Sequence, residues 1–154
     1  KAGRADNSPR GETPGFVRVL SDTTLAIPDR PGNNRLDSFA NMIENPAVGL
    51  LFMIPGVNEI LRINGKAELR DDPELMQRFV VDGKAPRLVV LVHVEEAYLH
   101  CAKAIMRAQL WDPDAQVERS VLPTMAEMIR DQTGSGTPSE SQEEMEQRYR
   151  TQLY

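Results

Sequence analysis

A chain of 154 residues is long enough to form one domain with a hydrophobic core. Hydrophobic residues make up 40% of it and charged residues 27%, which excludes a disordered tail and a membrane-spanning protein. The net charge of −5 argues against binding to the phosphate backbone of nucleic acids. Because Cys101 is the one cysteine of the chain, it has no disulfide partner there, and we expect a reducing, cytoplasmic compartment.

Charge is distributed unevenly along the chain. Residues 1–40 carry a net charge of +1, residues 41–111 carry −1 and residues 112–154 carry −5. The first forty residues are therefore the better place to look for an anion site. The longest apolar run, residues 48–54, is far shorter than the roughly 20 residues of a membrane-spanning helix, so we expect no membrane association. The chain opens with neither a signal peptide nor an initiator methionine, so a preceding segment is expected to be missing.

The first forty-five residues are predicted to form two strands and a helix. Residues 15–27 have the apolar pattern of two strands, with a turn at residues 21–23 between them. Residues 34–45 place apolar side chains on one face at helical spacing. Asn33 or Asn34 is expected to cap the first turn of this helix.

The middle of the chain is predicted to alternate between strands and a short helix. Residues 47–54 are apolar enough to predict a strand buried on both faces. Residues 60–69 alternate between polar and apolar side chains, which predicts a strand with one buried face. Pro73 stands where a short helix is expected to begin, and the valine-rich residues 88–94 predict another strand.

The last third is predicted to be helical. Residues 98–110 carry an apolar stripe at helical spacing. Thr124 and Glu127 have the spacing of a capping box at the start of the next helix. Residues 132–138 have the composition of a linker, and a charged helix is expected over residues 139–153.

These elements predict a mainly β protein with peripheral helices, in the α+β class. Strands arranged as hairpins favour an antiparallel sheet or small barrel with helices packed outside it over a doubly wound parallel sheet. We treat residues 1–154 as one domain, in which residues 114–154 form a helical C-terminal extension.

The segment that best suits an anion is the turn ahead of the first predicted helix. It brings together Arg30, Asn33, Asn34 and Arg35 among glycine and proline residues. Backbone N–H groups at a helix start favour anions, and arginine adds a two-pronged donor for phosphate. The alternative is a surface turn with an asparagine cap. The pattern is not a P-loop, because the lysine and the serine or threonine after the second glycine are absent.

A second turn, which contains Ser8 and Arg10, can meet the same anion. It is rigid because proline lies between these two residues. The alternative is an ordinary loop with no ligand.

A third group lies on the predicted helix over residues 98–110. His100, Lys103 and Arg107 would share one side of it, which suits an anionic ligand, a partner chain or simply a solvated face. Trp111 follows and is expected to be either a core residue or a lid over a flat ring.

Metal binding and nucleophilic catalysis are not predicted. His93, His100 and Cys101 lack the spacing of a metal site. We expect Cys101 to be a buried, inert thiol, although neighbouring cations could lower its pKa. The chain also lacks a G-x-S-x-G motif.

Four short motifs, in this order, resemble one known family. They are Asp6–Gly11, Asp29–Asn33, His100–Ala104 and Leu110–Pro113. The order of strand, helix and turns through Ile27–Arg35, Glu44–Phe52 and Leu61–Ala67 resembles the pyridoxamine 5′-phosphate oxidase family, and the four motifs are similar to a bacterial subgroup of FMN-dependent flavoproteins within it. The likeness covers about residues 5–113.

The resemblance implies an FMN-binding split β-barrel with Greek-key topology that pairs into a homodimer. FMN would lie between the two subunits, and the N-terminal helix and first strand of the family are expected to be missing here. The function implied is that of an FMN-dependent oxidoreductase for a small-molecule substrate of unknown identity. The alternatives are a non-catalytic protein that binds or stores flavin, and a split barrel that binds heme or a deazaflavin.

The resemblance also assigns residues to the cofactor. Each of them occupies a position at which family members contact the phosphate, the ring edge or the cofactor of the partner subunit. The residues are Ser8, Arg10, Arg30, Asn33, Asn34, Arg35, Arg107 and Trp111. The serine-arginine-lysine turn of the oxidases is replaced here by residues 33–35, and Ile60 stands where they have a glutamine. These departures argue against oxidation of vitamin B6.

Overall fold

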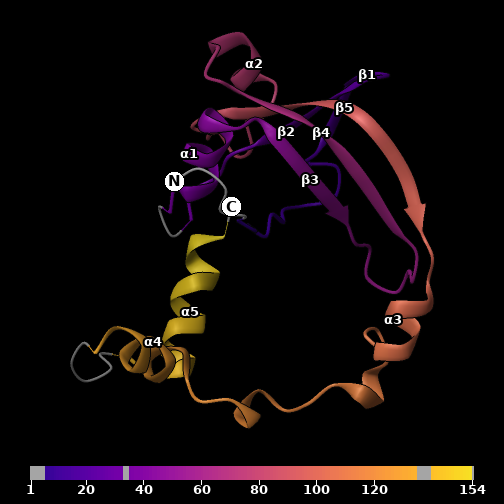
Figure 1. Ribbon diagram of the computed structural model, residues 1–154. Coiled ribbons are helices and arrows are strands. Elements are labelled where there is room, and N and C mark those ends of the chain that lie inside the picture. Colours follow the sequence, from indigo (N-terminus) through magenta and orange to yellow (C-terminus); the bar gives the residue numbers. More distant parts are fainter. Residues whose placement is uncertain (1–5, 33–34, 135–139, 154) are drawn as a thin grey trace. The chain divides into compact units, whose positions relative to one another are not determined.

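Five antiparallel strands form one sheet in the computed structural model, which describes residues 6–32, 35–134 and 140–153 (Figure 1). The strands lie side by side in the order β1-β2-β5-β4-β3. Their bounds are β1 Arg18–Ser21, β2 Thr24–Pro28, β3 Ala47–Phe52, β4 Ile60–Arg70 and β5 Val89–His100. Strands β3, β4 and β5 follow one another in the sheet, and β2, which the chain joins to β3 through α1, lies beside β5; this is a Greek-key order. Strands β1 and β3 are its two edges, so the sheet is not closed into a barrel by the described residues.

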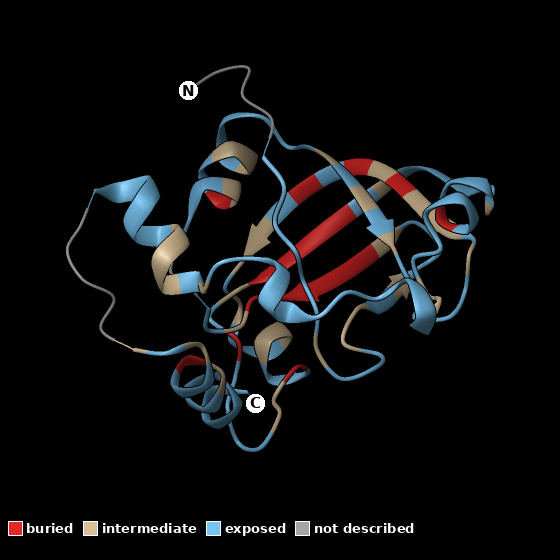
Figure 2. Cartoon of the chain, turned by 90° about the horizontal axis from the view of Figure 1, so that it is seen from below, coloured by how far each residue is buried: buried red, intermediate tan, exposed pale blue. Residues whose placement is uncertain are grey.

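The antiparallel sheet with helices beside it agrees with the predicted mainly β class. The two central strands explain why the core lies where it does. Leu25–Pro28 of β2 and Val89–Val92 of β5 are buried without interruption, because both faces of these strands are covered (Figure 2). Alternate residues enter two separate apolar clusters, one on each face of the sheet.

A helix or loop from elsewhere in the chain covers each cluster. Helix α1, Asp37–Glu44, places Phe39 among the residues of one face, such as Ile63. The other face receives Phe79, which follows the short helix α2, Pro73–Gln77. The expected helix start at Pro73 is confirmed.

The start of α1 differs from the prediction. Its N-cap is Leu36, which has no side-chain acceptor for the N–H groups of the first turn. Asn33 and Asn34, the predicted caps, lie outside the described residues.

The prediction that the strand after α1 is buried on both faces is wrong. β3 alternates between exposed and partly buried residues, and Leu51 is 63% exposed. β3 is an edge strand with a helix-covered core on one face, where Val48, Leu50 and Phe52 pack. Apolar content alone therefore overstated its burial.

The helix predicted over residues 98–110 begins later. β5 continues to His100, and helix α3 covers Lys103–Ala108. Pairing with β4, for example Leu61 opposite Leu99, extends the strand and overrides the helical spacing of these side chains. His100 is therefore in a strand and does not share a helical face with Lys103 and Arg107.

A bulge interrupts the pairing of β4 with β5 between Asn64 and Gly65. At Gly65 the backbones approach so closely that a Cβ atom would lie 2.2 Å from the carbonyl oxygen of His93. Glycine is thus required there by the space between the strands.

The chain divides into two compact units, Lys1–Trp111 and Asp112–Tyr154. The second unit contains the 3₁₀ turns η1, Pro113–Ala115, and η2, Arg119–Val121, and the helices α4, Met125–Thr133, and α5, Gln142–Gln152. The division falls two residues before residue 114, where the sequence analysis begins the helical extension.

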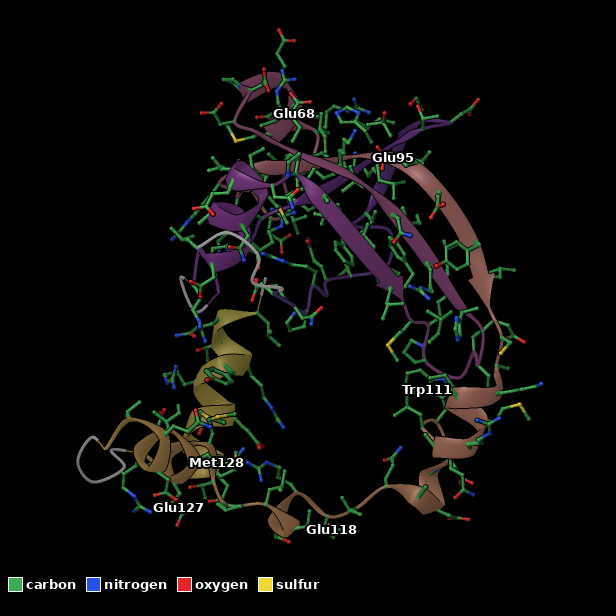
Figure 3. The ribbon with its side chains drawn as sticks, in the orientation of Figure 1. Glu68, Glu95, Trp111, Glu118, Glu127 and Met128 are labelled. Atoms are coloured by element: carbon green, nitrogen blue, oxygen red, sulfur yellow. The ribbon has the colours of Figure 1, made fainter. Side chains whose placement is uncertain are left out.

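Both long helices of the second unit begin with capping boxes. The predicted box of Thr124 and Glu127 is confirmed, and Ser141 with Glu144 forms another at the start of α5. Hydrogen bonds from the Thr124 hydroxyl and backbone N–H hold the pKa of Glu127, which is labelled in Figure 3, below its ordinary value of 4.5. Met145 is the buried residue of α5.

Candidate functional site

Residues 6–16 run beside the end of β2 and the start of α1, and two ion pairs hold them there. An Arg10 nitrogen lies 2.7 Å from a carboxylate oxygen of Asp29. A nitrogen of the next residue, Arg30, lies 3.0 Å from a carboxylate oxygen of Glu12. The two adjacent residues after β2 thus pair with two residues of this segment. In one pair the segment supplies the arginine, and in the other it supplies the carboxylate.

The Arg30 pair is buried. The Arg30 and Glu12 side chains are 8% and 3% exposed, and the guanidinium donates two hydrogen bonds to that carboxylate. It also donates to the carbonyl oxygens of Phe79 and Lys84, at 2.7 Å and 3.3 Å. Arg30 therefore joins the 6–16 segment, the end of β2 and the loop after α2.

The Arg10 side chain is more exposed to solvent than that of Arg30. Its side chain is 33% exposed, and Asp29 is its one hydrogen-bond partner among the described residues. Its guanidinium carbon lies 5.2 Å from the centre of the Phe39 ring, a cation–π distance. Asp29 itself is buried, at 8% exposure. Arg10 is thus oriented by a buried carboxylate and a core aromatic ring while part of its side chain faces solvent.

A third arginine, Arg35, lies just before α1. Arg35 pairs with Asp37 at 3.0 Å, and the two side chains are 76% and 62% exposed. An exposed pair of this kind contributes about 0–1 kcal/mol, so a stronger anion can displace the carboxylate. Nearby, the Ser38 hydroxyl donates a hydrogen bond to Asp6, which ties the 6–16 segment to the start of α1.

Four of the eight sequence-predicted cofactor residues thus lie around the end of β2 and the start of α1. They are Ser8, Arg10, Arg30 and Arg35. Ser8 is exposed. Asn33 and Asn34 lie outside the described residues.

The other two predicted residues lie at the far end of the sheet. Arg107 is exposed in the last turn of α3. The Trp111 indole nitrogen donates a hydrogen bond of 2.8 Å to the carbonyl oxygen of Val57, in the connection after β3 (Figure 3). The six residues of β3, which span on the order of 20 Å, lead from α1 toward this connection. One chain therefore does not bring the two groups together.

A hollow of about 130 Å³ lies beside the buried Arg30 pair, between Phe16, Arg18 and Phe79, and it is too small for a flavin. Ligand pockets typically measure about 300–1,000 Å³.

Two residues that orient the predicted arginines, Asp29 and Glu12, were not predicted from the sequence. Asp29 is adjacent to Arg30 in the predicted turn, but its partner is 19 residues away; Glu12 is 18 residues from its own partner. The one available signal in the sequence was an acidic residue one or two positions from an arginine, as in Asp29-Arg30 and Arg10-Gly11-Glu12. Its pairing depends on how the 6–16 segment crosses β2, which local spacing does not encode.

Another charged group lies on neighbouring strands of the sheet, where Figure 3 labels Glu68. Glu68 lies 2.9 Å from His93 and 3.0 Å from Arg70, and their hydrogen bonds hold its pKa below the ordinary 4.5. These side chains are half exposed, so we interpret the group as a surface network.

The expectation that Cys101 is buried is wrong, because it lies exposed just after β5, beyond the covered part of the strand. Within residues 6–32, 35–134 and 140–153, no group of three or more histidine, cysteine or acidic side chains is placed to hold a metal ion. In the same ranges, no helix combines the length and apolar character needed to cross a bilayer.

Comparison with known proteins gives one family match. A profile of the pyridoxamine 5′-phosphate oxidase family matches residues 2–101, well over half of the chain. A search of curated proteins finds no match. Crystal structures of HupZ from Group A Streptococcus and of a variant of it are similar at 17% and 18% identity, with TM-scores of 0.45 and 0.44. The alignments cover 55% of this chain and 68% and 73% of the HupZ chains, and likeness at this level carries no argument about function.

Proposed function

Because the chain belongs to the pyridoxamine 5′-phosphate oxidase family, we propose that it is an FMN-dependent oxidoreductase whose cofactor lies between two copies of the chain. FMN has a doubly charged phosphate at one end and a flat, largely apolar ring at the other. A site for it needs fixed cationic donors and an apolar slot some distance away.

The residues around the start of α1 suit the phosphate. Arg10 is already oriented, and Arg35 stands directly ahead of the helix in an exposed ion pair. The N-cap Leu36 leaves first-turn N–H groups of α1 without a side-chain acceptor. Arginine forks and helix N–H groups are the usual donors to phosphate in proteins. Arg30 contributes through the fold, since its guanidinium is buried among protein acceptors.

The observation that carries the proposal is the separation of the two groups of predicted residues. Arg107 and Trp111 lie at the opposite end of the sheet from Arg10 and Arg35, and the hollow beside Arg30 is too small to hold a flavin. In a twofold dimer the α3 end of a second copy can face the α1 end of the first. The site is then complete only in the homodimer.

Bound FMN would supply the redox chemistry by transferring a hydride or electrons. The chain would hold the phosphate through Arg10 and Arg35, and Ser8, Asn33 and Asn34 remain predicted ligands from the family resemblance. Trp111 of the second copy would cover the ring and exclude water from it. The substrate is proposed only as a small molecule.

The visible spectrum and the molecular mass of the purified protein test this proposal together. We expect flavin bands near roughly 370 and 450 nm, release of FMN on heating, and the mass of a dimer by light scattering. Turnover of reduced nicotinamide with an electron acceptor then separates an oxidoreductase from a flavin-storage protein. A heme or deazaflavin spectrum, or a protein that stays colourless after FMN is added, would contradict the proposal.

A further inference from the structure

Two arginines at the proposed phosphate end have the same kind of partner but different surroundings. Arg30 is 8% exposed and donates to Glu12, Phe79 and Lys84. Arg10 is 33% exposed and donates through one nitrogen to Asp29. A guanidinium has five N–H donors, so the Arg10 side chain retains donors for a ligand, whereas that of Arg30 is surrounded by protein acceptors.

We infer that Asp29 positions Arg10 as the phosphate ligand of the site, and that it does so despite its own negative charge. This inference rests on the proposed FMN site. Asp29 is 8% exposed, and a buried carboxylate keeps its partner because leaving it unpaired is unfavourable.

The ring of Phe39 supports the guanidinium from a second side, at 5.2 Å. Phe39 is 7% exposed and belongs to the main apolar cluster, so it offers a fixed surface. A long, flexible side chain held in this way loses less conformational entropy when a ligand binds. The planar fork of arginine can keep one nitrogen on Asp29 while its other edge faces a phosphate.

This role makes a prediction opposite to that of simple electrostatics. Asp29 adds a negative charge close to a doubly negative ligand, so its removal should strengthen FMN binding if charge alone mattered. If Asp29 acts by orienting Arg10, its truncation weakens binding. The sign of the effect therefore separates the two explanations.

The experiment measures dissociation constants for FMN and for riboflavin, which lacks the phosphate, with the full chain. The variants are Arg10→Ala, Asp29→Ala, Asp29→Asn and the double variant Arg10→Ala/Asp29→Ala. Arg10→Ala should weaken FMN binding about 10- to 100-fold, the scale of a charge-assisted hydrogen bond, and leave riboflavin binding within about twofold. Asp29→Ala should weaken FMN binding in the same direction, again without a matching loss for riboflavin.

Two further results would show that Asp29 acts by positioning Arg10. Asp29→Asn keeps an oxygen acceptor for Arg10 and removes the charge, so it should bind FMN at least as tightly as the original chain. In the Arg10→Ala background, Asp29→Ala should cause no further weakening of FMN binding, because its positioning role acts through Arg10. Tighter FMN binding by Asp29→Ala, equal losses for FMN and riboflavin, or additive effects in the double variant would each overturn the inference.

A measurement on the unaltered chain covers the case in which Asp29→Ala does not fold. The NMR signal of the Arg10 Nε–H group should be sharp in the free protein and should shift when inorganic phosphate is added. No shift with phosphate would overturn the role of Arg10. If the protein binds neither FMN nor riboflavin, the proposed function fails, and this phosphate titration still decides whether Arg10 is an anion ligand.

Discussion

At the scale of single residues, burial decides what an arginine does. Arg10 and Arg30 each pair with an acidic residue across the same two segments. The Arg30 pair is nearly inaccessible, so the loss of one partner would leave a buried charge, whereas the Arg10 side chain is 33% exposed. The sequence places both in similar turns, and the tertiary structure separates their roles.

Glu12→Ala is predicted to destabilise the fold by about 3–5 kcal/mol, because it leaves the Arg30 guanidinium buried without its carboxylate partner. Urea unfolding of the full chain, followed by circular dichroism, measures this free energy.

Asp37→Ala is the matched control. It also removes the carboxylate of an arginine pair, but the pair with Arg35 is exposed, so the change should stay below about 1 kcal/mol. Equal losses in the two variants would show that burial does not distinguish these pairs.

At the scale of elements, partners in the sheet determine which residues become strand. Residues 98–100 have helical spacing in the sequence, yet they extend β5 because β4 provides hydrogen-bonding partners up to Ile60. Likewise, the apolar strand β3 lies at the edge of the sheet, where half of its residues are exposed and the other half are only partly buried. Spacing predicts the faces of an element, but its neighbours set its length and burial.

Gly65→Ala is predicted to destabilise the protein by about 2 kcal/mol or more, because the new Cβ would lie 2.2 Å from the backbone oxygen of His93. The contact is with backbone of a central strand, which cannot move aside without breaking the pairing of β4 with β5. Thermal unfolding of the variant measures the effect.

Gly49→Ala provides the comparison on the same sheet. Its Cβ would meet only the side-chain oxygen of Asn64 among the described residues, at an ordinary 3.5 Å, and the stability should change by less than about 1 kcal/mol. If both glycines tolerated alanine equally, the close approach at the bulge would not be a constraint.

At the scale of the whole molecule, the two compact units differ in what holds them together. Both apolar clusters of the sheet lie between residues 16 and 94, inside the first unit. The second unit relies on capping boxes, on Met145, and on hydrogen bonds from Arg119 to Leu122, Pro123 and Gln142.

A chain ending at Trp111 is therefore predicted to keep the sheet and to unfold cooperatively, with a Tm within about 5 °C of the full chain. Calorimetry measures the transition. Loss of cooperative unfolding would mean that the sheet depends on the second unit.

The mass of this shortened chain by light scattering assigns a role to the acidic C-terminal unit. A monomer would identify the unit as a dimer arm, and an unchanged dimer would identify it as a solvated extension. In either case, the proposal that the protein binds FMN is tested separately, by its visible absorption spectrum.

The sequence alone was sufficient for the class of fold, the strand–helix order, the capping box at Thr124, the helix start at Pro73 and the family resemblance. These features depend on composition, periodicity and motifs within a few residues of each other. The tertiary structure decided which turn residues meet, since Asp29 and Glu12 reach partners 19 and 18 residues away, respectively. It also decided the length of β5, the edge position of β3 and the separation of Trp111 from Arg10, because long-range pairing and burial are properties of the folded sheet and not of local sequence.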